Sequence, residues 1–372
     1  MQSAGDPIES LAAALRDAYP ELEALREAAS EPVYLVGGAV RDLLLGCGRA
    51  DIDVVVEGDA GALAARLGAE PVEHERFATA KVELDGHEVD IASARTETYA
   101  HPGALPEVAP AAAIEADLGR RDFTINAMAI PLREASRVID PHAGRSDLTA
   151  GLLRVLHRES FVDDPTRAIR AARYASRFGF EPEPQTAALL RTTDLQTVSA
   201  DRRQAELLRL AAEPTAARGF ELLAEWGLLV LRPGGLELAG RVGELLDGTL
   251  WDLGVDRDRV VLAAATGQPG REVELAAARP DRPSEAVAMA RAHRPAELVL
   301  ARAIGAEWLD AYVAEWRRVE LEIDGSDLLA AGVPQGPALG RGLAAALRAK
   351  LDGEVEGRER ELAVALAAAT VE

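Results

Sequence analysis

Cysteine, lysine and long apolar runs are scarce in this sequence. Cys47 is the single cysteine among 372 residues, which excludes an internal disulfide and a cysteine-rich metal site. The six histidines stand in no spacing typical of zinc ligands. No apolar run approaches the roughly 20 residues that a membrane-spanning helix needs. The opening residues, MQSAGDPIES, lack the basic and apolar regions of a secretory signal. We therefore expect a cytoplasmic protein without membrane association.

Basic residues are in the minority, and the formal net charge is −21. Such a charge disfavours a nucleic-acid partner if it is spread evenly. The distribution is uneven, however, because eleven arginines and only seven acidic residues lie between Gly119 and Arg177. The sequence therefore permits one basic region that binds a polyanion.

The spacing of apolar residues divides the chain into a mixed part and a helical part. Residues 8–29 carry leucines at helical spacing, and from residue 33 short apolar runs alternate with turn signals. We expect strands at 34–36 and 52–56, a helix at 39–45, a helix N-capped by Asp59 and ending near Leu67, a hairpin over 81–92 that turns at Asp85-Gly86, and a loop over 101–110. After about residue 145 strand signals almost vanish, and helical patterns continue to the end. This order predicts an α+β fold.

Two aspartates, Asp51 and Asp53, interrupt the apolar strand at 52–56. Residues i and i+2 of a strand share a face, so the two carboxylates lie side by side and repel each other unless a cation compensates them. Mg²⁺ suits such ligands, because it takes a few carboxylates together with substrate phosphates. Asp90, near the end of the hairpin, could supply a third carboxylate. The alternative is an edge strand with solvated acids.

Gly37 and Gly38 stand between the first strand and the first helix of the mixed part. Glycines at such a turn let backbone amides approach a phosphate, and Arg41, one helical turn later, could add a bidentate contact. A plain tight turn is the alternative. The sequence contains neither the P-loop motif nor a G-x-G-x-x-G motif after a strand, which excludes those two kinds of nucleotide site.

The ordered set GGAVRDLLLG…DID, residues 37–53, resembles the signature of the Pol β-like nucleotidyltransferases. The resemblance is to the family of class II tRNA nucleotidyltransferases and bacterial poly(A) polymerases in particular. It implies a catalytic head with a small mixed or antiparallel sheet, where Asp51 and Asp53 face two Mg²⁺ ions and a nucleoside triphosphate. The implied domains are a helical cap (1–30), the head (31–142), a neck that recognises the base (143–198) and an all-helical, tRNA-binding body and tail (199–372).

The stretch RRDFTINAMA, residues 120–129, resembles the second motif of this family, which contacts the ribose. Asp122 and Asn126 are four residues apart, so they would share one helical face and could bind a 2'-hydroxyl. Arg121 could hold the phosphates. The alternative is an exposed, capped helix with an Arg–Asp pair.

The stretch FVDDPTRAIRAARYASRFGF, residues 161–180, resembles the base-reading helix of the family. Asp164 and Arg167 are three residues apart, so we expect them on one face and paired with each other. The carboxylate can accept a hydrogen bond from the exocyclic amine of cytosine or adenine, while the guanidinium donates to an adjacent ring acceptor. Uracil and guanine present a carbonyl there, which a carboxylate repels. Residue chemistry thus predicts CTP and ATP as substrates.

Three further arginines, Arg170, Arg173 and Arg177, continue this stripe and suit triphosphate or RNA phosphates. Asp163 departs from the family pattern, because many relatives have the longer glutamate there. A capped amphipathic helix with salt bridges is the alternative interpretation of the whole stretch.

The rest of the chain carries weaker resemblances. Residues 95–110, RTETYAHPGALPEVAP, correspond to a flexible loop that helps complete CCA-adding members to switch from CTP to ATP. Residues 201–229 and 321–365 resemble the body and the C-terminal signature of the family.

The resemblance implies an enzyme that completes or repairs tRNA 3' ends without a template and without an obligatory protein partner. The tRNA 3'-hydroxyl would attack the nucleotide α-phosphate and release pyrophosphate. Related alternatives are an A-adding enzyme, a CC-adding enzyme and a poly(A) polymerase, although the acidic end of this chain disfavours the last. Alternatives from other classes are a non-catalytic RNA-binding module and an enzyme that nucleotidylates a protein or an antibiotic.

Overall fold

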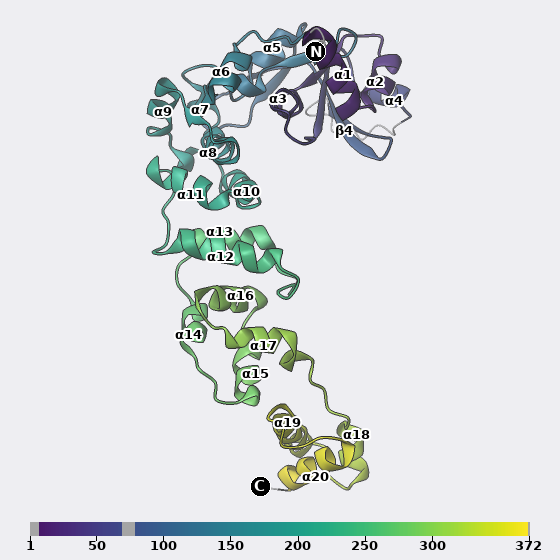
Figure 1. The fold of residues 1–372 in the computed structure, drawn as a ribbon, viewed down its shortest axis with the longest axis vertical. Coiled ribbons are helices and arrows are strands. Elements are labelled where there is room, and N and C mark those ends of the chain that lie inside the picture. The colour runs from purple at the N-terminus through teal and green to yellow at the C-terminus, as the bar shows by residue number, and fades with distance from the viewer. Residues whose placement is uncertain (1–6, 69–78, 371–372) are drawn as a thin grey trace, which may run out of the picture. The chain divides into compact units, whose positions relative to one another are not determined.

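The computed structural model describes residues 7–68 and 79–370 and divides the chain into two compact units (Figure 1). The first unit extends to residue 215 and includes residues 222–228, and the second comprises residues 216–221 and 229 onward. The expected domain boundaries near residues 30, 142 and 198 all fall within the first unit, so they stay predictions. Among the described helices, none is long and apolar enough to cross a membrane.

The first unit contains a five-stranded sheet with the order β3-β4-β2-β1-β7. Its strands are β1 (Val33–Val36), β2 (Ile52–Val56), β3 (Thr79–Leu84), β4 (His87–Ser93) and β7 (Ala129–Pro131). Strands β2 and β4 are parallel and the other neighbours are antiparallel, which makes the sheet mixed, one of the two arrangements that the resemblance implied. The hairpin turns at Asp85 and Gly86, whose φ angles of 51° and 78° are left-handed, as a type I' turn requires.

The helices next to the sheet follow the sequence pattern. Strand β1 is buried throughout, and in β2 only Asp53 is exposed. Helices α1 (Pro7–Ala18), α2 (Leu22–Ala28) and α3 (Gly38–Leu45) occupy the predicted positions. Helix α4 (Ala60–Arg66) starts at Asp59, whose carboxylate accepts from the N–H groups of Gly61 and Ala62.

The remainder of the first unit is mostly helical. Its helices are α5 (Ile114–Gly119), α6 (Gly144–Ala150), α7 (Ser160–Asp163), α8 (Thr166–Phe178), α9 (Pro184–Leu190) and α10 (Ala200–Ala211), with 3₁₀ turns at Thr124–Asn126 and Leu195–Thr197. Two small two-stranded sheets pair β5 (Arg95–Thr98) with β6 (Glu107–Pro110) and β8 (Leu152–Leu153) with β9 (Glu181–Pro182).

Two local predictions were wrong. The segment 101–110 is not entirely loop, because Glu107–Pro110 pairs antiparallel with β5; its proline stands at the strand end, where a missing N–H is tolerated. The helix expected around Asp122 is replaced by extended backbone at Phe123, which bridges to Val155, followed by the 3₁₀ turn.

The second unit is built from helices over the residues that the structure describes. They are α12 (Gly235–Asp247), α13 (Arg257–Thr266), α14 (Arg271–Ala277), α15 (Pro283–Arg291), α16 (Pro295–Ile304), α17 (Trp308–Ala314), a 3₁₀ turn (Trp316–Arg318), α18 (Gly325–Ala330), α19 (Pro337–Leu351) and α20 (Arg358–Ala369), while α11 (Ala216–Glu225) is divided between the units. Helices α19 and α20 approach closely, because a Cβ at Gly342 would lie 2.6 Å from the carbonyl oxygen of Ala365.

Candidate active site

A cavity of about 640 Å³ lies within the first unit, where the sheet, the turn into α3 and the start of α8 meet. The cavity brings together ten of the fourteen predicted site residues: Gly37, Gly38, Asp53, Asp90, Arg121, Asp122, Asn126, Asp164, Arg167 and Arg170. The other four, all within the described residues, do not line it: Arg41, Asp51, Asp163 and Arg173.

Carboxylates form one wall of the cavity, at the end of the sheet. Asp53 on β2 and Asp90 on β4 are directly paired in the parallel register, and Lys81 on β3 is paired with Asp90. The ammonium group of Lys81 lies 3.4 Å from Asp90 Oδ1. Asp51 is exposed, just ahead of β2.

The pKa of Asp53 is raised, chiefly because the surrounding protein desolvates its carboxylate. Arg121 opposes this shift, whereas Asp90 and Asp51 add to it. Within the described residues, no three His, Cys, Asp or Glu side chains are arranged to hold a metal ion. Carboxylates such as those of Asp51 and Asp53 are ligands that a hard cation takes together with phosphate oxygens and water, and metal-binding roles for Asp51, Asp53 and Asp90 stay predictions.

The glycine turn brings the backbone close to this wall. Gly37 has a φ of 68°, and a Cβ there would lie 2.8 Å from Arg121 Nη1 and 4.0 Å from Asp53 Oδ2. Arg121 itself donates to Asp117 at 3.0 Å. Glycine at position 37 therefore leaves space between the first turn of α3, a basic side chain and a carboxylate, as an anionic ligand needs.

Arg41 is buried and does not line the cavity. Its guanidinium lies 4.6 Å from the ring centre of Phe178 and 5.0 Å from that of Tyr174. It donates to Asp42 at 2.8 Å and to the side-chain oxygen of Asn126 at 2.7 Å. In this structure Arg41 braces Asn126, whereas the sequence predicted a phosphate contact.

Asp122 and Asn126 are hydrogen-bonded at 2.9 Å, although through the 3₁₀ turn and not along a helical face. Arg170 Nε donates to the other carboxylate oxygen of Asp122 at 3.0 Å. Burial alone would raise the pKa of Asp122, but Arg170 and the hydrogen bond from Asn126 hold it below its usual value. The carboxylate is therefore ionised and oriented at neutral pH.

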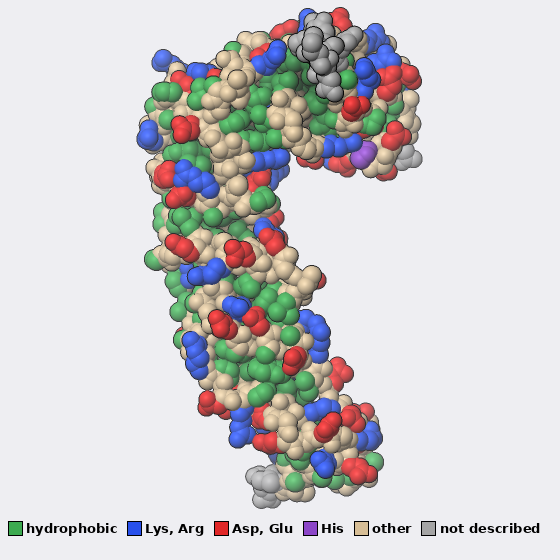
Figure 2. Space-filling model, viewed as in Figure 1, with side chains coloured by type: hydrophobic (Ala, Val, Ile, Leu, Met, Phe, Trp, Pro, Cys, Tyr) green, Lys and Arg blue, Asp and Glu red, His purple; other side chains and the backbone are tan. Residues whose placement is uncertain are grey.

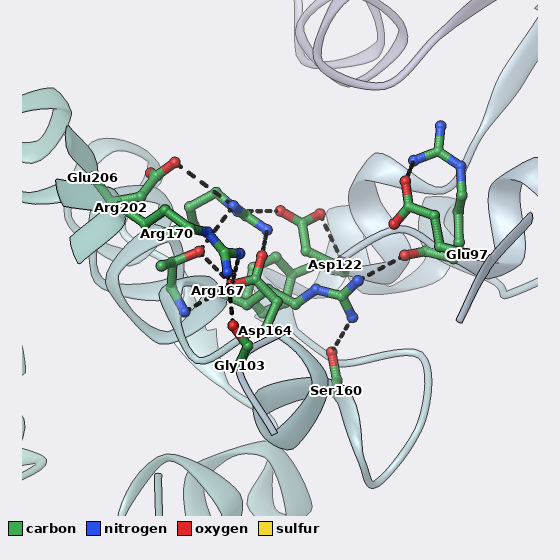
Figure 3. Close-up of polar contacts among 12 residues, drawn as sticks. Glu97, Gly103, Asp122, Ser160, Asp164, Arg167, Arg170, Arg202 and Glu206 are labelled. Carbon is green, nitrogen blue, oxygen red and sulfur yellow. Dashed lines mark hydrogen bonds and ion pairs between the residues drawn. The ribbon is translucent and has the colours of Figure 1, made fainter. Parts of the chain in front are cut away.

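Asp164 and Arg167 both reach the cavity, but the predicted pair between their side chains is replaced by other partners (Figure 3). Asp164 accepts from Arg202 at 3.1 Å and from Arg170 at 3.4 Å. Arg167 donates to Ser160 Oγ and to the carbonyl of Arg120, both at 2.8 Å. The reason is local, because the backbone of Asp164 is extended between α7 and α8, so helical spacing does not apply to it.

Burial of Asp164 would raise its pKa, but Arg170 and the other nearby donors lower it. The two remaining predicted residues face other partners. Asp163 lies 3.9 Å from His157, and Arg173 lies 3.6 Å from Glu213.

Comparison with known proteins identifies the family. The model of the "Poly A polymerase head domain" matches residues 33–154, and that of the "Probable RNA and SrmB- binding site of polymerase A" matches residues 179–231. The CC-adding tRNA nucleotidyltransferase of Deinococcus radiodurans is 38% identical over 88% of this chain and 87% of its own length. The chain belongs to the tRNA nucleotidyltransferase and poly(A) polymerase family.

Further members of this family match over part of their length. The A-adding tRNA nucleotidyltransferase of Geobacter sulfurreducens is 33% identical over 90% of this chain and 45% of its own length. The corresponding enzyme of Halalkalibacterium halodurans is 46% identical over 52% of this chain and 48% of its own length. The chain thus spans about half the length of these two relatives.

Solved structures of the family have the same α+β fold. The Thermotoga maritima CCA-adding enzyme complexed with tRNA is 27% identical, with a TM-score of 0.74 over 97% of this chain and 98% of that chain. Two complexes of a CCA-adding enzyme are 28% identical: one with ATP (TM-score 0.74, 97% of this chain and 96% of that chain) and one with CTP (TM-score 0.75, 96% of each).

Sequence reasoning missed several residues of the site in this tRNA nucleotidyltransferase-family chain. Arg202 lines the cavity from α10. Glu97 in β5 and Tyr99, directly after β5, line it as well. Burial, with Glu97 close by, raises the pKa of Tyr99 to about 12. The sequence could not single out Arg202, because it is followed by a second arginine. Only the structure shows that Arg203 points elsewhere and donates to the carbonyl of Leu195 at 3.0 Å.

Proposed function

We propose that this chain adds nucleotides from CTP and ATP to the 3' end of tRNA, without a template and with release of pyrophosphate. The observation that carries the proposal is one cavity that holds the Asp53 wall, the glycine turn and the Asp164–Arg167 segment together. The names of the family members and the ATP, CTP and tRNA complexes of CCA-adding enzymes support it. The reaction would take place in the cytoplasm, where we expect the protein.

Different groups of the cavity would bind different parts of the nucleotide. The N–H groups at the start of α3 and the guanidinium of Arg121 would bind the triphosphate. Asp122, which is ionised and held by Arg170, would accept from the ribose hydroxyl, and the amide of Asn126 would stay aligned through Arg41. Asp51 and Asp53 would hold two Mg²⁺ ions. When bound, these ions would lower the pKa of the attacking hydroxyl and neutralise charge on the phosphates.

Base selection would depend on Asp164 and Arg167. Oδ1 of Asp164 already accepts from Arg202 and from the backbone N–H of Thr166 at 3.0 Å, whereas Oδ2 accepts only the 3.4 Å contact from Arg170 among the hydrogen bonds described. Oδ2 is therefore the oxygen with capacity for the exocyclic amine of cytosine or adenine. Its negative charge would reject the carbonyl of uracil or guanine.

A second candidate is the addition of cytidines only. It is favoured by the CC-adding relative, which matches over nearly the full length of both chains. The two candidates share the same chemistry and differ in the number of nucleotides added.

The test is extension of a tRNA that lacks its three terminal nucleotides, with Mg²⁺ and each nucleotide alone or CTP and ATP together. Products are resolved at single-nucleotide steps. Three additions that end in adenosine are the expected result, and a stop after two cytidines would select the second candidate. Incorporation only into a tRNA that already ends in CC would identify an A-adding enzyme. The absence of extension on every acceptor would contradict the proposal.

A further inference from the structure

We propose that Asp117 is a positioning residue that fixes the guanidinium of Arg121 toward the triphosphate of the nucleotide. Asp117 does not line the cavity, whereas Arg120 and Arg121 do, so its effect passes through these two side chains. The inference rests on the proposed function of the cavity, since it concerns how that cavity would hold the phosphates.

The Asp117 carboxylate is fully buried in α5 and holds two consecutive arginines. Arg120 and Arg121 follow it at three and four residues, the spacings at which side chains of a helical turn meet. Each arginine has one carboxylate oxygen: Oδ1 accepts from Arg120 at 2.8 and 3.0 Å, and Oδ2 accepts from Arg121 at 3.0 and 3.3 Å. The backbone N–H of Arg95 also donates to Oδ1, at 3.3 Å. These donors fix the orientation of the carboxylate.

The contact with Asp117 occupies one edge of the Arg121 guanidinium. Nε and Nη2 donate to Oδ2 of Asp117, and none of the hydrogen bonds among the described residues uses the third nitrogen, Nη1. Nη1 faces the glycine turn, because a Cβ at Gly37 would lie 2.8 Å from it. A guanidinium is planar, so a carboxylate that holds one edge also sets the direction of the remaining nitrogen. Asp117 therefore directs Nη1 to the place where the triphosphate would lie.

The charge of Asp117 supports the same role. Burial would raise the pKa of this carboxyl, but Arg121 and Arg120 hold it below its usual value, so it is ionised at neutral pH. Its negative charge compensates the two adjacent guanidinium groups, which would otherwise repel each other. An Arg121 released from Asp117 would be attracted to Asp53, whose pKa the charge of Arg121 already lowers. Asp117 thus keeps Arg121 available for phosphate.

The test is the equilibrium affinity for CTP and for CMP, measured with Mg²⁺ in the absence of tRNA for the full chain and its variants. The ratio of the two dissociation constants reports the contribution of the β- and γ-phosphates, because a change in base or ribose contacts affects both nucleotides alike. Asp117→Asn has one acceptor oxygen for two arginines. We expect its preference for CTP over CMP to fall by about tenfold, the size of one lost charge-assisted hydrogen bond.

Asp147→Asn is the matched control. Asp147 is a second buried carboxylate of the first unit, accepts from Arg154 at 3.0 Å and from Thr124 at 2.7 Å, and does not line the cavity. Its replacement also weakens a contact between an aspartate and an arginine, so it controls for a loss of stability. The ratio for this variant should equal that of the wild type.

Arg121→Lys tests the inference from the other partner and keeps the positive charge. An ammonium cannot give one edge to Asp117 and a further nitrogen to a phosphate, so the ratio should fall nearly as far as in Arg121→Ala. The double variant Asp117→Asn/Arg121→Ala should fall no further than Arg121→Ala, because both changes act on one contact.

A wild-type ratio in Asp117→Asn would overturn the inference, and so would a wild-type ratio in Arg121→Lys, which applies even if Asp117→Asn does not fold. The ratio comes from binding alone and does not depend on transfer. A wild type that binds CTP but extends no tRNA would therefore count against the proposed function, while the variants would still decide the role of Asp117.

Discussion

Arg170 is a cation of the cavity that contacts three carboxylates. Its guanidinium lies 3.0 Å from Asp122, 3.4 Å from Asp164 and 3.6 Å from Glu206. Burial would lower the pKa of Arg170, but these three carboxylates raise it, so the guanidinium stays charged. The side chains that would bind the ribose and the base thus share one cation.

Replacement of Arg170 should make stability depend on pH in a defined direction. In the wild type the pKa values of Asp122 and Asp164 are depressed, so the stability they contribute is present above their unfolded pKa and is lost as the pH falls through the folded values. In Arg170→Met, Asp122 loses the arginine paired with it while Asp164 keeps Arg202, so burial raises the pKa of Asp122 most, and a penalty appears as the pH rises. We expect the variant to lose about 3 kcal/mol of unfolding free energy at pH 7 and less at pH 5.

Urea denaturation at both pH values measures this difference. Arg173→Met, on the same helix, is the control, because Arg173 pairs with Glu213, which also lies 3.8 Å from Arg177. The loss for the control should be smaller. An equal loss for Arg170→Met at pH 5 and pH 7 would contradict the assigned network.

Ten of the fourteen site residues that the sequence predicted line the cavity, but several of their partners were misassigned. Residue type and spacing identify Asp53, Asp164 and Arg167 as charged groups of one site. They do not give the direction of a side chain, which depends on the backbone: Asp164 is extended and accepts from Arg202, and Arg41 packs against two aromatic rings. Partners that are distant in sequence could not be read from local patterns.

At the scale of elements, two adjacent residues at the start of α6 have opposite steric requirements: the backbone at 143 favours glycine although the residue is alanine, whereas position 144 has no room for a Cβ. Ala143 has a φ of 60°, a left-handed conformation that alanine rarely adopts. Gly144 has an N–H that donates to Asp140 at 2.6 Å, and a Cβ on it would lie 2.2 Å from the carbonyl oxygen of Thr124.

Substitutions at this pair should therefore have opposite signs. Ala143→Gly relieves a strain of about 1–2 kcal/mol and adds some unfolded-state entropy, for a net gain of about 0.5–1 kcal/mol. Gly144→Ala forces the backbone apart and should cost about 3 kcal/mol or more. Thermal denaturation of both variants measures this contrast; a destabilised Ala143→Gly variant would show that the left-handed residue carries no strain.

Elements with a clear periodic pattern of apolar residues or a local turn or cap signal were predictable. Elements that depend on pairing with a segment distant in the sequence were not. The alternating pattern of β3 and β4 with its Asp85-Gly86 turn, and the Asp59 cap of α4, follow from local chemistry. Strand β6 was missed because three prolines within residues 101–110 indicate a loop, and only its pairing with β5 makes it a strand. The two-residue strands β8 and β9 are too short to leave a periodic signal.

At the scale of the whole molecule, a chain with a net charge of −21 would have to bind a polyanion. On the face drawn in Figure 2, basic and acidic side chains are interspersed along both units. Attraction to tRNA would therefore come from local groups of arginines and not from the overall charge.

We expect tRNA binding to weaken at least about tenfold between 50 and 200 mM salt, because each phosphate contact releases counterions. Filter binding or fluorescence titration at fixed Mg²⁺ measures this dependence. An affinity that does not change with salt would mean that phosphate contacts contribute little to recognition.

The most direct measurement for the central claim, that nucleotidyl transfer takes place in the cavity at the end of the sheet, compares the wild type with Asp53→Asn. A single labelled nucleotide from CTP or ATP is transferred to tRNA acceptors in a single turnover with Mg²⁺. The wild type should extend the tRNA, and Asp53→Asn, although folded, should be slower by at least about a hundredfold, since several kcal/mol of transition-state stabilisation are removed. An Asp53→Asn variant that transfers at the wild-type rate would place the chemistry elsewhere.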